Sequence, residues 1–175
     1  MTHAPKADHR TNRLLAALEP DDFALLEPHL DIVDLKRGQV LYEMGDIVHH
    51  AYFPHDAIIS LVNVMEDGST VEVGVFGREG VLGLLSALVT REAFGRYIVQ
   101  FSGAASRIAY ERLNDVRDAS PNLRQLIMRY GEALLAHTFQ NVTCNAIHPV
   151  EARCCRWILA MHDRADGNPH LSVDA

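Results

Sequence analysis

Histidines are the first residues in this chain whose types and spacing could do chemistry. His49 and His50 are adjacent, and His55 follows them in the same short stretch. Imidazole nitrogens bind zinc, iron and copper, so this stretch could offer ligands to a metal ion or a haem. Adjacent residues of a strand point in opposite directions, however, which makes joint ligation by His49 and His50 awkward. We therefore expect hydrogen-bonded or solvated histidines, no metal site and no cofactor.

The cysteines offer no better site. The chain has three, Cys144, Cys154 and Cys155, and an odd number with an adjacent pair is poorly suited to disulfides. An iron–sulfur cluster normally takes four cysteine ligands, which this chain lacks. We expect small residues that pack on helices, in a protein of the reducing cytoplasm.

Motifs of the known catalytic classes are missing. The histidine stretch lacks the His-x-His, carboxylate and further His of a cupin-like metal enzyme, and no Gly-x-Ser-x-Gly, Walker loop or zinc motif occurs. We therefore expect a binding or regulatory protein and not an enzyme. A net charge of −7 also argues against a basic surface that would hold nucleic acid by itself.

The elements that position these residues begin with a polar arm and two short helices. The arm covers residues 1–11, and the helices are expected at Asn12–Leu18 and Asp21–Leu30. From Asp31 to Tyr110, short apolar runs alternate with Gly, Asp and Pro, which is typical of a sheet of many short strands. The expected strands are Ile32–Leu35, Val40–Tyr42, His50–Phe53, Ile58–Val64, Thr70–Phe76, Tyr97–Phe101 and Ala105–Ala109.

Two local signals lie inside this β region. Glu66-Asp67-Gly68-Ser69 predicts a hairpin turn, since glycine accepts the positive φ that such a loop demands. A short helix is expected at about Gly80 to Leu88. The free amides at the start of that helix could attract an anion.

The last third of the chain predicts a long helix. Ser120 provides an N-cap and Pro121 a first-turn proline, and nothing interrupts the pattern before Pro149. Such a helix has about 27 residues and is about 40 Å long at 1.5 Å per residue. A second helix follows from Val150 to about Arg164. No stretch of the chain is apolar for long enough to span a membrane.

One face of the long helix has more apolar surface than a small domain can cover. Residues at alternating spacings of three and four define this face, and they are Ile127, Tyr130, Leu134, His137, Asn141 and Cys144. A second copy of the helix is the natural cover, which predicts a homodimer. The alternative is that this face packs on the chain's own β domain.

Three strings in this order resemble the Crp/Fnr superfamily of transcription regulators. Residues 36–46 have the form Lys-x-Gly-x-x-Leu-x-x-x-Gly-Asp, which looks like the entry to that family's β-roll. Residues 72–83 look like its phosphate-binding cassette, and residues 144–153 resemble the junction between dimer helix and DNA-binding domain. The resemblance implies an α+β fold: an antiparallel β-roll (a double-stranded β-helix or jelly roll) flanked by short helices, followed by a long C-terminal dimerisation helix.

The resemblance also implies an effector pocket. Its residues in this sequence would be Gly77, Glu79, Gly80, Gly83, Leu84, Arg91 and Arg96. Members that bind cyclic AMP pair a Gly-Glu with an Arg-Ser or Arg-Thr, because a buried phosphate needs a cation or amide donors. Here Leu84 follows Gly83, and neither arginine precedes a small hydroxyl residue. A cyclic nucleotide, an unknown small molecule and a purely structural roll therefore all remain open.

The resemblance divides the chain into four parts. A flexible arm covers residues 1–11, the sensor domain 12–118, the dimerisation helix 119–148, and the start of a DNA-binding domain 149–175. In this family a helix-turn-helix enters the major groove. The sequence stops before that element, so DNA would be bound only through a C-terminal domain absent from this chain.

The function implied is that of the sensor and dimerisation half of a regulator, which couples an effector or other signal to DNA binding. A complete protein of this kind could also contact RNA polymerase. The alternative is a stand-alone cyclic-nucleotide-binding-like module, or a dominant-negative dimerisation partner, with no DNA binding of its own.

Overall fold

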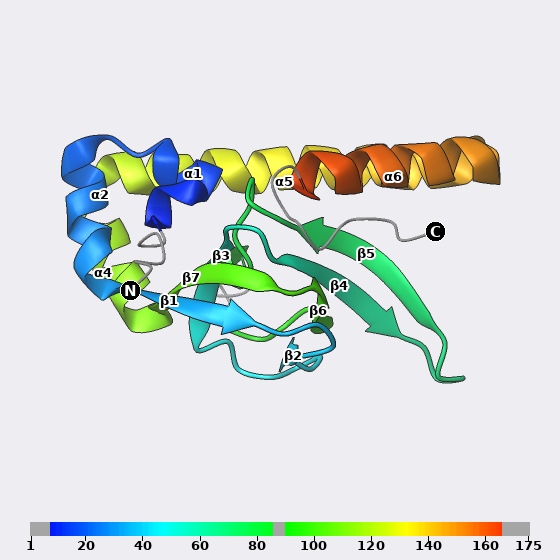
Figure 1. Cartoon of the computed structure of the whole chain (residues 1–175), viewed down its shortest axis with the longest axis horizontal. Coiled ribbons are helices and arrows are strands. Elements are labelled where there is room, and N and C mark those ends of the chain that lie inside the picture. Colours follow the sequence, from blue (N-terminus) through cyan, green and yellow to red (C-terminus); the bar gives the residue numbers. More distant parts are fainter. Residues whose placement is uncertain (1–7, 86–89, 166–175) are drawn as a thin grey trace, which may run out of the picture.

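A computed structural model describes residues 8–85 and 90–165, which form a β-roll beside a long pair of helices (Figure 1). Before the roll come η1 (His9–Thr11), α1 (Arg13–Ala16), α2 (Pro20–Leu26) and η2 (Glu27–His29). The strands are β1 (Leu30–Leu35), β2 (Val40–Tyr42), β3 (His50–Pro54), β4 (Ile58–Val64), β5 (Thr70–Phe76), β6 (Arg96–Phe101) and β7 (Gly103–Ala109). The helices α4 (Tyr110–Ala119), α5 (Pro121–Ile147) and α6 (Val150–Ala165) follow.

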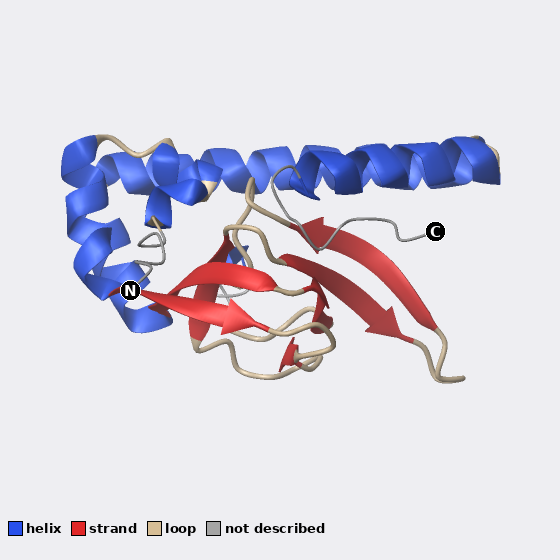
Figure 2. Ribbon diagram, viewed as in Figure 1, coloured by secondary structure: helices blue, strands red, loops and turns tan. Residues whose placement is uncertain are grey.

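The strands form two antiparallel sheets that enclose the roll (Figure 2). One sheet has the order β1-β7-β3 and the other β2-β6-β4-β5, so β5 is an edge strand. The hairpin predicted at Glu66–Ser69 is present. Its turn is closed by the amide of Met65, which donates to the carbonyl of Ser69 at 2.8 Å. The predicted α+β fold and all seven predicted strands are confirmed.

Two apolar cores hold the molecule together. The first lies between the N-terminal helices, α4 and the first half of α5, and includes Leu15, Leu113 and Ile127. The second fills the roll and includes Ile59, Tyr97 and Val99. Among the described helices, none combines the length and apolar character that crossing a membrane would require.

The start of α5 is fixed by a buried polar cap. The amide of Leu123 donates to the hydroxyl of Ser120 at 3.0 Å, as expected for an N-cap. The same hydroxyl donates to Asp22 of α2 at 2.5 Å, and the Asn122 amide donates to Asp22 at 2.9 Å. Both hydrogen bonds lower the pKa of Asp22, and the bond from Ser120 has the larger effect. The cap therefore joins the first helices to the long one.

Helix α4 was not predicted. It begins at Tyr110 directly after β7, and its N-cap, Ala109, has no side chain that could accept a hydrogen bond. Its buried residues Tyr110, Leu113 and Val116 are spaced by three, which places them on one face against the first core. That spacing is the sequence signal from which α4 could have been predicted.

The helix expected from Gly80 begins later. Leu82 instead bridges to Tyr52 of β3, and helical structure begins at Leu84, while residues 86–89 lie outside the described part of the chain. Gly83 takes a φ of +85°, and a Cβ there would approach the carbonyl of His50 to 2.9 Å. The close packing of this segment on β3 thus excludes a helix turn at Gly80.

At the N-terminus, helical structure begins before the expected end of the arm. Asp8 caps η1 by accepting from the amide of Arg10 at 2.9 Å, and the guanidinium of Arg10 lies 4.3 Å from the ring centroid of Phe23. His9 bonds to Ser106 at 2.7 Å. Residues 8–11 are therefore attached to the domain, and residues 1–7 lie outside the described part of the chain.

Candidate functional site

The roll contains a small cavity beside Gly83, one of the residues expected in the effector pocket. Its volume is about 60 Å³. The described residues that line it are apolar, aromatic or glycine: Leu61, Phe76, Val81, Gly83, Leu85, Phe94, Tyr97 and Leu134.

Neighbouring strands and the long helix bring these residues together. Leu61 of β4 pairs with Tyr97 of β6, and Phe76 ends β5 with its ring 6.0 Å from that of Tyr97. Leu134 of α5 closes the cavity from the helix side. Inward-facing strand residues of this kind follow from alternation along a strand, which is the signal that could have identified them.

The chemistry of this cavity does not match a cyclic phosphate. A buried phosphate needs a cation or amide donors, and none of the lining residues just named carries a charge. Pockets for small molecules have volumes of roughly 300–1,000 Å³, several times that of this cavity. In this conformation it has room for a small apolar group or a few water molecules.

The two arginines of the expected pocket are occupied elsewhere. Arg91 forms an ion pair with Glu111 of α4 at 2.9 Å, and its guanidinium lies 4.6 Å from the ring centroid of Tyr110. Arg96 forms an ion pair with Glu43 at 2.8 Å. Both arginines are partly exposed, and neither lines the cavity. Their carboxylate partners come from distant parts of the sequence, which local spacing could not reveal.

The amides near Gly80 are also occupied, which removes the anion site expected there. The Gly80 amide donates to the carbonyl of Gly77 at 3.0 Å, and the Leu82 amide donates to Tyr52 at 2.8 Å. The Val81 amide donates to the hydroxyl of Tyr130 at 3.2 Å. Of the expected pocket residues, Gly83 alone lines the cavity.

Gly77 and Glu79 serve instead as a contact for α6. Glu79 forms an ion pair with Arg164 at 2.7 Å. A Cβ on Gly77 would lie 2.9 Å from the Cγ of Arg164, so a larger residue would push the helix away. The end of β5 is therefore in contact with the last helix.

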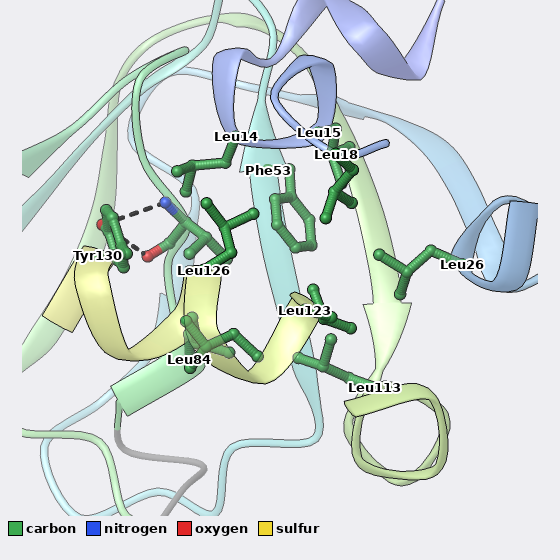
Figure 3. A pocket seen from close by; sticks show the side chains of 12 residues that line it. Leu14, Leu15, Leu18, Leu26, Phe53, Leu84, Leu113, Leu123, Leu126 and Tyr130 are labelled. Carbon is green, nitrogen blue, oxygen red and sulfur yellow. Dashed lines mark hydrogen bonds between the residues drawn. The ribbon is translucent and has the colours of Figure 1, made fainter. Parts of the chain in front are cut away.

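Tyr130 connects the rim of the cavity to α5 (Figure 3). Its hydroxyl accepts from the amide of Val81 and donates to the carbonyl of the same residue at 3.1 Å. Burial raises the pKa of Tyr130 to about 12, so the hydroxyl keeps its proton. The Val81 segment is thus joined directly to the long helix.

The core beside Tyr130 contains only a packing void. Its volume is about 20 Å³. Leucines from α1, α2, α4 and α5 surround it together with Leu84 (Figure 3). A void of this size holds about one water molecule. Leu84, which was expected in the effector pocket, is therefore a core residue.

The face of α5 predicted to meet a second copy turns toward the chain itself. Ile127 is buried in the first core, and Leu134 packs against the second. Farther along, Asn141 accepts a hydrogen bond from Arg156 of α6, Cys144 is buried, and His137 lines a groove beside α6. The alternative, that this face packs on the chain's own β domain, agrees with the contact of Leu134, whereas Asn141 contacts α6.

His50 and His55 lie in separate environments. The His50 amide donates to the hydroxyl of Tyr42 at 2.9 Å, and the His55 ring bonds to Ser106 at 2.7 Å. Among residues 8–85 and 90–165, no three His, Cys, Asp or Glu side chains gather closely enough to hold a metal ion. Cys144, Cys154 and Cys155 are all free thiols.

Comparison with known proteins agrees with this fold. Residues 32–104 match the family model of the cyclic nucleotide-binding domain. None of the curated proteins compared with the sequence matches it.

Solved structures of regulators have the same fold. The N-terminal domain of a transcriptional regulator from Streptomyces coelicolor is 22% identical, with 77% of this chain and 94% of that chain covered and a TM-score of 0.58. The c-di-GMP-responsive global regulator of Xanthomonas campestris is 16% identical over 80% and 70%, with a TM-score of 0.66. The catabolite activator protein of Thermus thermophilus is 16% identical over 76% and 61%, with a TM-score of 0.58. Residues 32–104 therefore resemble the cyclic nucleotide-binding domain, and the chain has the fold of Crp/Fnr-type transcriptional regulators.

Proposed function

We propose that the chain is the sensor and dimerisation part of a Crp/Fnr-type transcription regulator. The observation that carries this proposal is an exposed apolar stripe on α5. Met128, Leu135 and Val142 recur every seven residues, and Phe139 lies between the last two. All four are between 54% and 66% exposed. Large contiguous apolar surface of this kind marks an interaction site.

The spacing of the stripe favours a second copy of the same helix. Apolar residues every three or four residues allow two helices to pack along a shared seam. Met128, Leu135 and Phe139 lie on the side of α5 away from Leu134, which packs on the roll, so both faces can be used at once. Val142, at the end of the stripe, also lines the groove beside α6. We assign the dimer seam to this outward stripe, in place of the six residues that the sequence suggested.

The roll is connected to both C-terminal helices, as a sensor would require. Tyr130 ties the Val81 segment to α5, and Glu79 ties the same region to α6 through Arg164. A ligand that displaced Leu134 from the roll cavity would therefore move α5 and shift the position of α6.

In such a regulator, residues 12–118 act as sensor, 119–148 as dimerisation helix and 149–175 as the start of the DNA-binding part. DNA recognition belongs to a helix-turn-helix, which is not among the described elements. A regulatory role in the cytoplasm, without catalysis and with RNA polymerase as a contact of the complete protein, fits this assignment.

Sedimentation velocity over a range of protein concentrations tests the proposal. The parent chain is expected to form a dimer. Leu135→Glu would bury an unpaired carboxylate in the seam and weaken the dimer by roughly a hundredfold or more, at 1.4 kcal/mol for each tenfold.

Leu25→Glu is the matched control. Leu25 lies on α2 and is 45% exposed, close to the 54% of Leu135. This variant is expected to dimerise like the parent. A parent chain that stays monomeric at every concentration, or an equal effect of both substitutions, would contradict the proposal.

A further inference from the structure

A groove runs between the edge strand β5 and the two C-terminal helices. Its volume is about 560 Å³, within the roughly 300–1,000 Å³ that small-molecule sites occupy. The strand contributes Val71, Glu72 and Val73, and α5 contributes His137 and Asn141. Three arginines of α6 complete it, namely Arg153, Arg156 and Arg164.

Two of these arginines have no carboxylate partner within residues 8–85 and 90–165. The side chain of Arg153 makes no hydrogen bond or ion pair with any residue of the described ranges, and its Nε is buried. Arg156 donates to the amide oxygens of Asn141 and Asn145, which orient the guanidinium but do not neutralise it. Only Arg164 forms an ion pair, with Glu79.

Among the residues that the structure describes, Glu72 is the one carboxylate that lines the groove, and it is already hydrogen-bonded. Glu72 accepts from the hydroxyl of Ser60 at 2.6 Å with one oxygen and from the indole of Trp157 at 2.9 Å with the other. Its one negative charge faces the two cations of Arg153 and Arg156. The described lining of the groove is therefore net positive, on a chain whose formal charge is −7.

His137 responds to this positive field. Its pKa is lowered, mainly because burial penalises the charged ring and further because Arg164 and Arg156 repel it. The imidazole is therefore held in its neutral form and can offer a nitrogen to a ligand.

The remaining walls are apolar and aromatic. Val71 and Val73 are 52% and 41% exposed on the strand side, and the Trp157 ring is 47% exposed. Aromatic rings of this kind stack with nucleobases, a contact worth about 1–3 kcal/mol for each base. Cationic, aromatic and apolar surfaces thus line one hollow.

We propose that this groove binds a phosphorylated ligand with a planar ring, of the nucleotide class, with its phosphates at Arg153 and Arg156 and its ring on Trp157. The site is separate from the roll cavity, which has neither the volume nor a cation. Its regulatory meaning rests on the proposed function, because a ligand held between β5, α5 and α6 would fix the last helix on the sensor. Binding itself does not depend on dimerisation.

The chain offers a built-in probe, since Trp157 is its only tryptophan. Titration with ADP is expected to change the tryptophan fluorescence in a saturable way, and calorimetry should report the same dissociation constant. Adenosine, which lacks phosphate, should bind at least roughly tenfold more weakly than ADP. Added salt should weaken the binding of ADP. Equal binding of adenosine and ADP, or no saturable response to ADP, would overturn the proposal.

Arg153→Gln and Arg156→Gln test the cations. Each is expected to weaken ADP binding by roughly tenfold or more, since a hydrogen bond to a charged group is worth about 1.5–3 kcal/mol. Arg112→Gln is the control, because Arg112 lies on α4 and pairs with Asp115 outside the groove. Unchanged ADP binding in both groove variants would overturn the site.

Sedimentation of the same samples separates the two proposals. A dimer that does not bind ADP contradicts the groove and leaves the dimer seam standing. A monomer that binds ADP contradicts the seam and supports the groove.

Discussion

The two halves of α5 lie in opposite environments. In the first half, Leu123 and Ile127 are buried in the core and Tyr130 is bonded to Val81. In the second half, Leu135, Phe139 and Val142 are exposed, and Asn141 accepts a hydrogen bond from Arg156 of α6. The same helix therefore stabilises the domain at one end and exposes apolar side chains at the other. Each half should respond differently to substitution.

The largest effect is expected from Ile127→Ala. Removing a buried isoleucine leaves a cavity in the first core, which costs about 2–5 kcal/mol in the free energy of unfolding. Urea denaturation measures this change, and it should be the same at every protein concentration. A cost below about 1 kcal/mol would show that the first half of α5 is not fixed as described.

Tyr130→Phe should have the next largest effect. It removes the hydroxyl and leaves the amide and carbonyl of Val81 without their partner, at a cost of about 1–3 kcal/mol. The shape of the ring is kept, so the loss reports the hydrogen bonds alone. If the variant unfolds like the parent, the connection between roll and helix contributes little to stability.

Leu135→Ala should matter only where the chain is associated. An exposed substitution in a monomer changes stability by about 0.5 kcal/mol or less, whereas a residue in a dimer seam contributes through mass action. Thermal unfolding at high and low protein concentration is the measurement. The deficit relative to the parent should shrink on dilution, and a deficit that persists would place Leu135 in the monomer core.

The smallest effect is expected from pH, through His55. Its pKa lies below the ordinary value of 6.5, first because it is buried and further because His9 repels the charged ring. The unfolded chain binds this proton more readily, so stability is full above about pH 6.5 and falls as the pH drops toward the folded pKa. Urea denaturation at several pH values follows this loss.

His55→Gln should reduce the dependence without removing it. His50 and His137 also have lowered pKa values, with burial the main cause for each. Comparison with His137→Gln shows how much the second half of α5 contributes. If the free energy of unfolding changes with pH as steeply in His55→Gln as in the parent chain, His55 does not contribute to this dependence and the prediction is wrong.

The strands could be predicted because their signals are local. The β4–β5 hairpin is set by Gly68 and its neighbours, and alternation of apolar residues gave the bounds of β4 and β5. Helix α4 lacks such a signal at its start, because Ala109 cannot cap it. By contrast, the start of α5 was predictable, because Ser120 can cap a helix and Pro121 suits its first turn.

The structure does not gather the expected pocket residues at one cavity, because the residues that hold them elsewhere are distant in the sequence. Arg91 is paired with Glu111 and Arg96 with Glu43. Pairs so far apart in the chain cannot be recognised from the spacing of residues in the sequence. Periodicity likewise could not distinguish two apolar stripes on α5. Both fit a helix, and only the packing of the roll decides which one faces inward.

Strand β5 is left with one unpaired edge, and α6 lies alongside it (Figure 1). Exposed strand edges recruit other chains and lead to aggregation. A version shortened at Ile147 would uncover Val71 and Val73 together with that edge. We therefore expect the isolated domain without this helix to aggregate more readily than the parent chain.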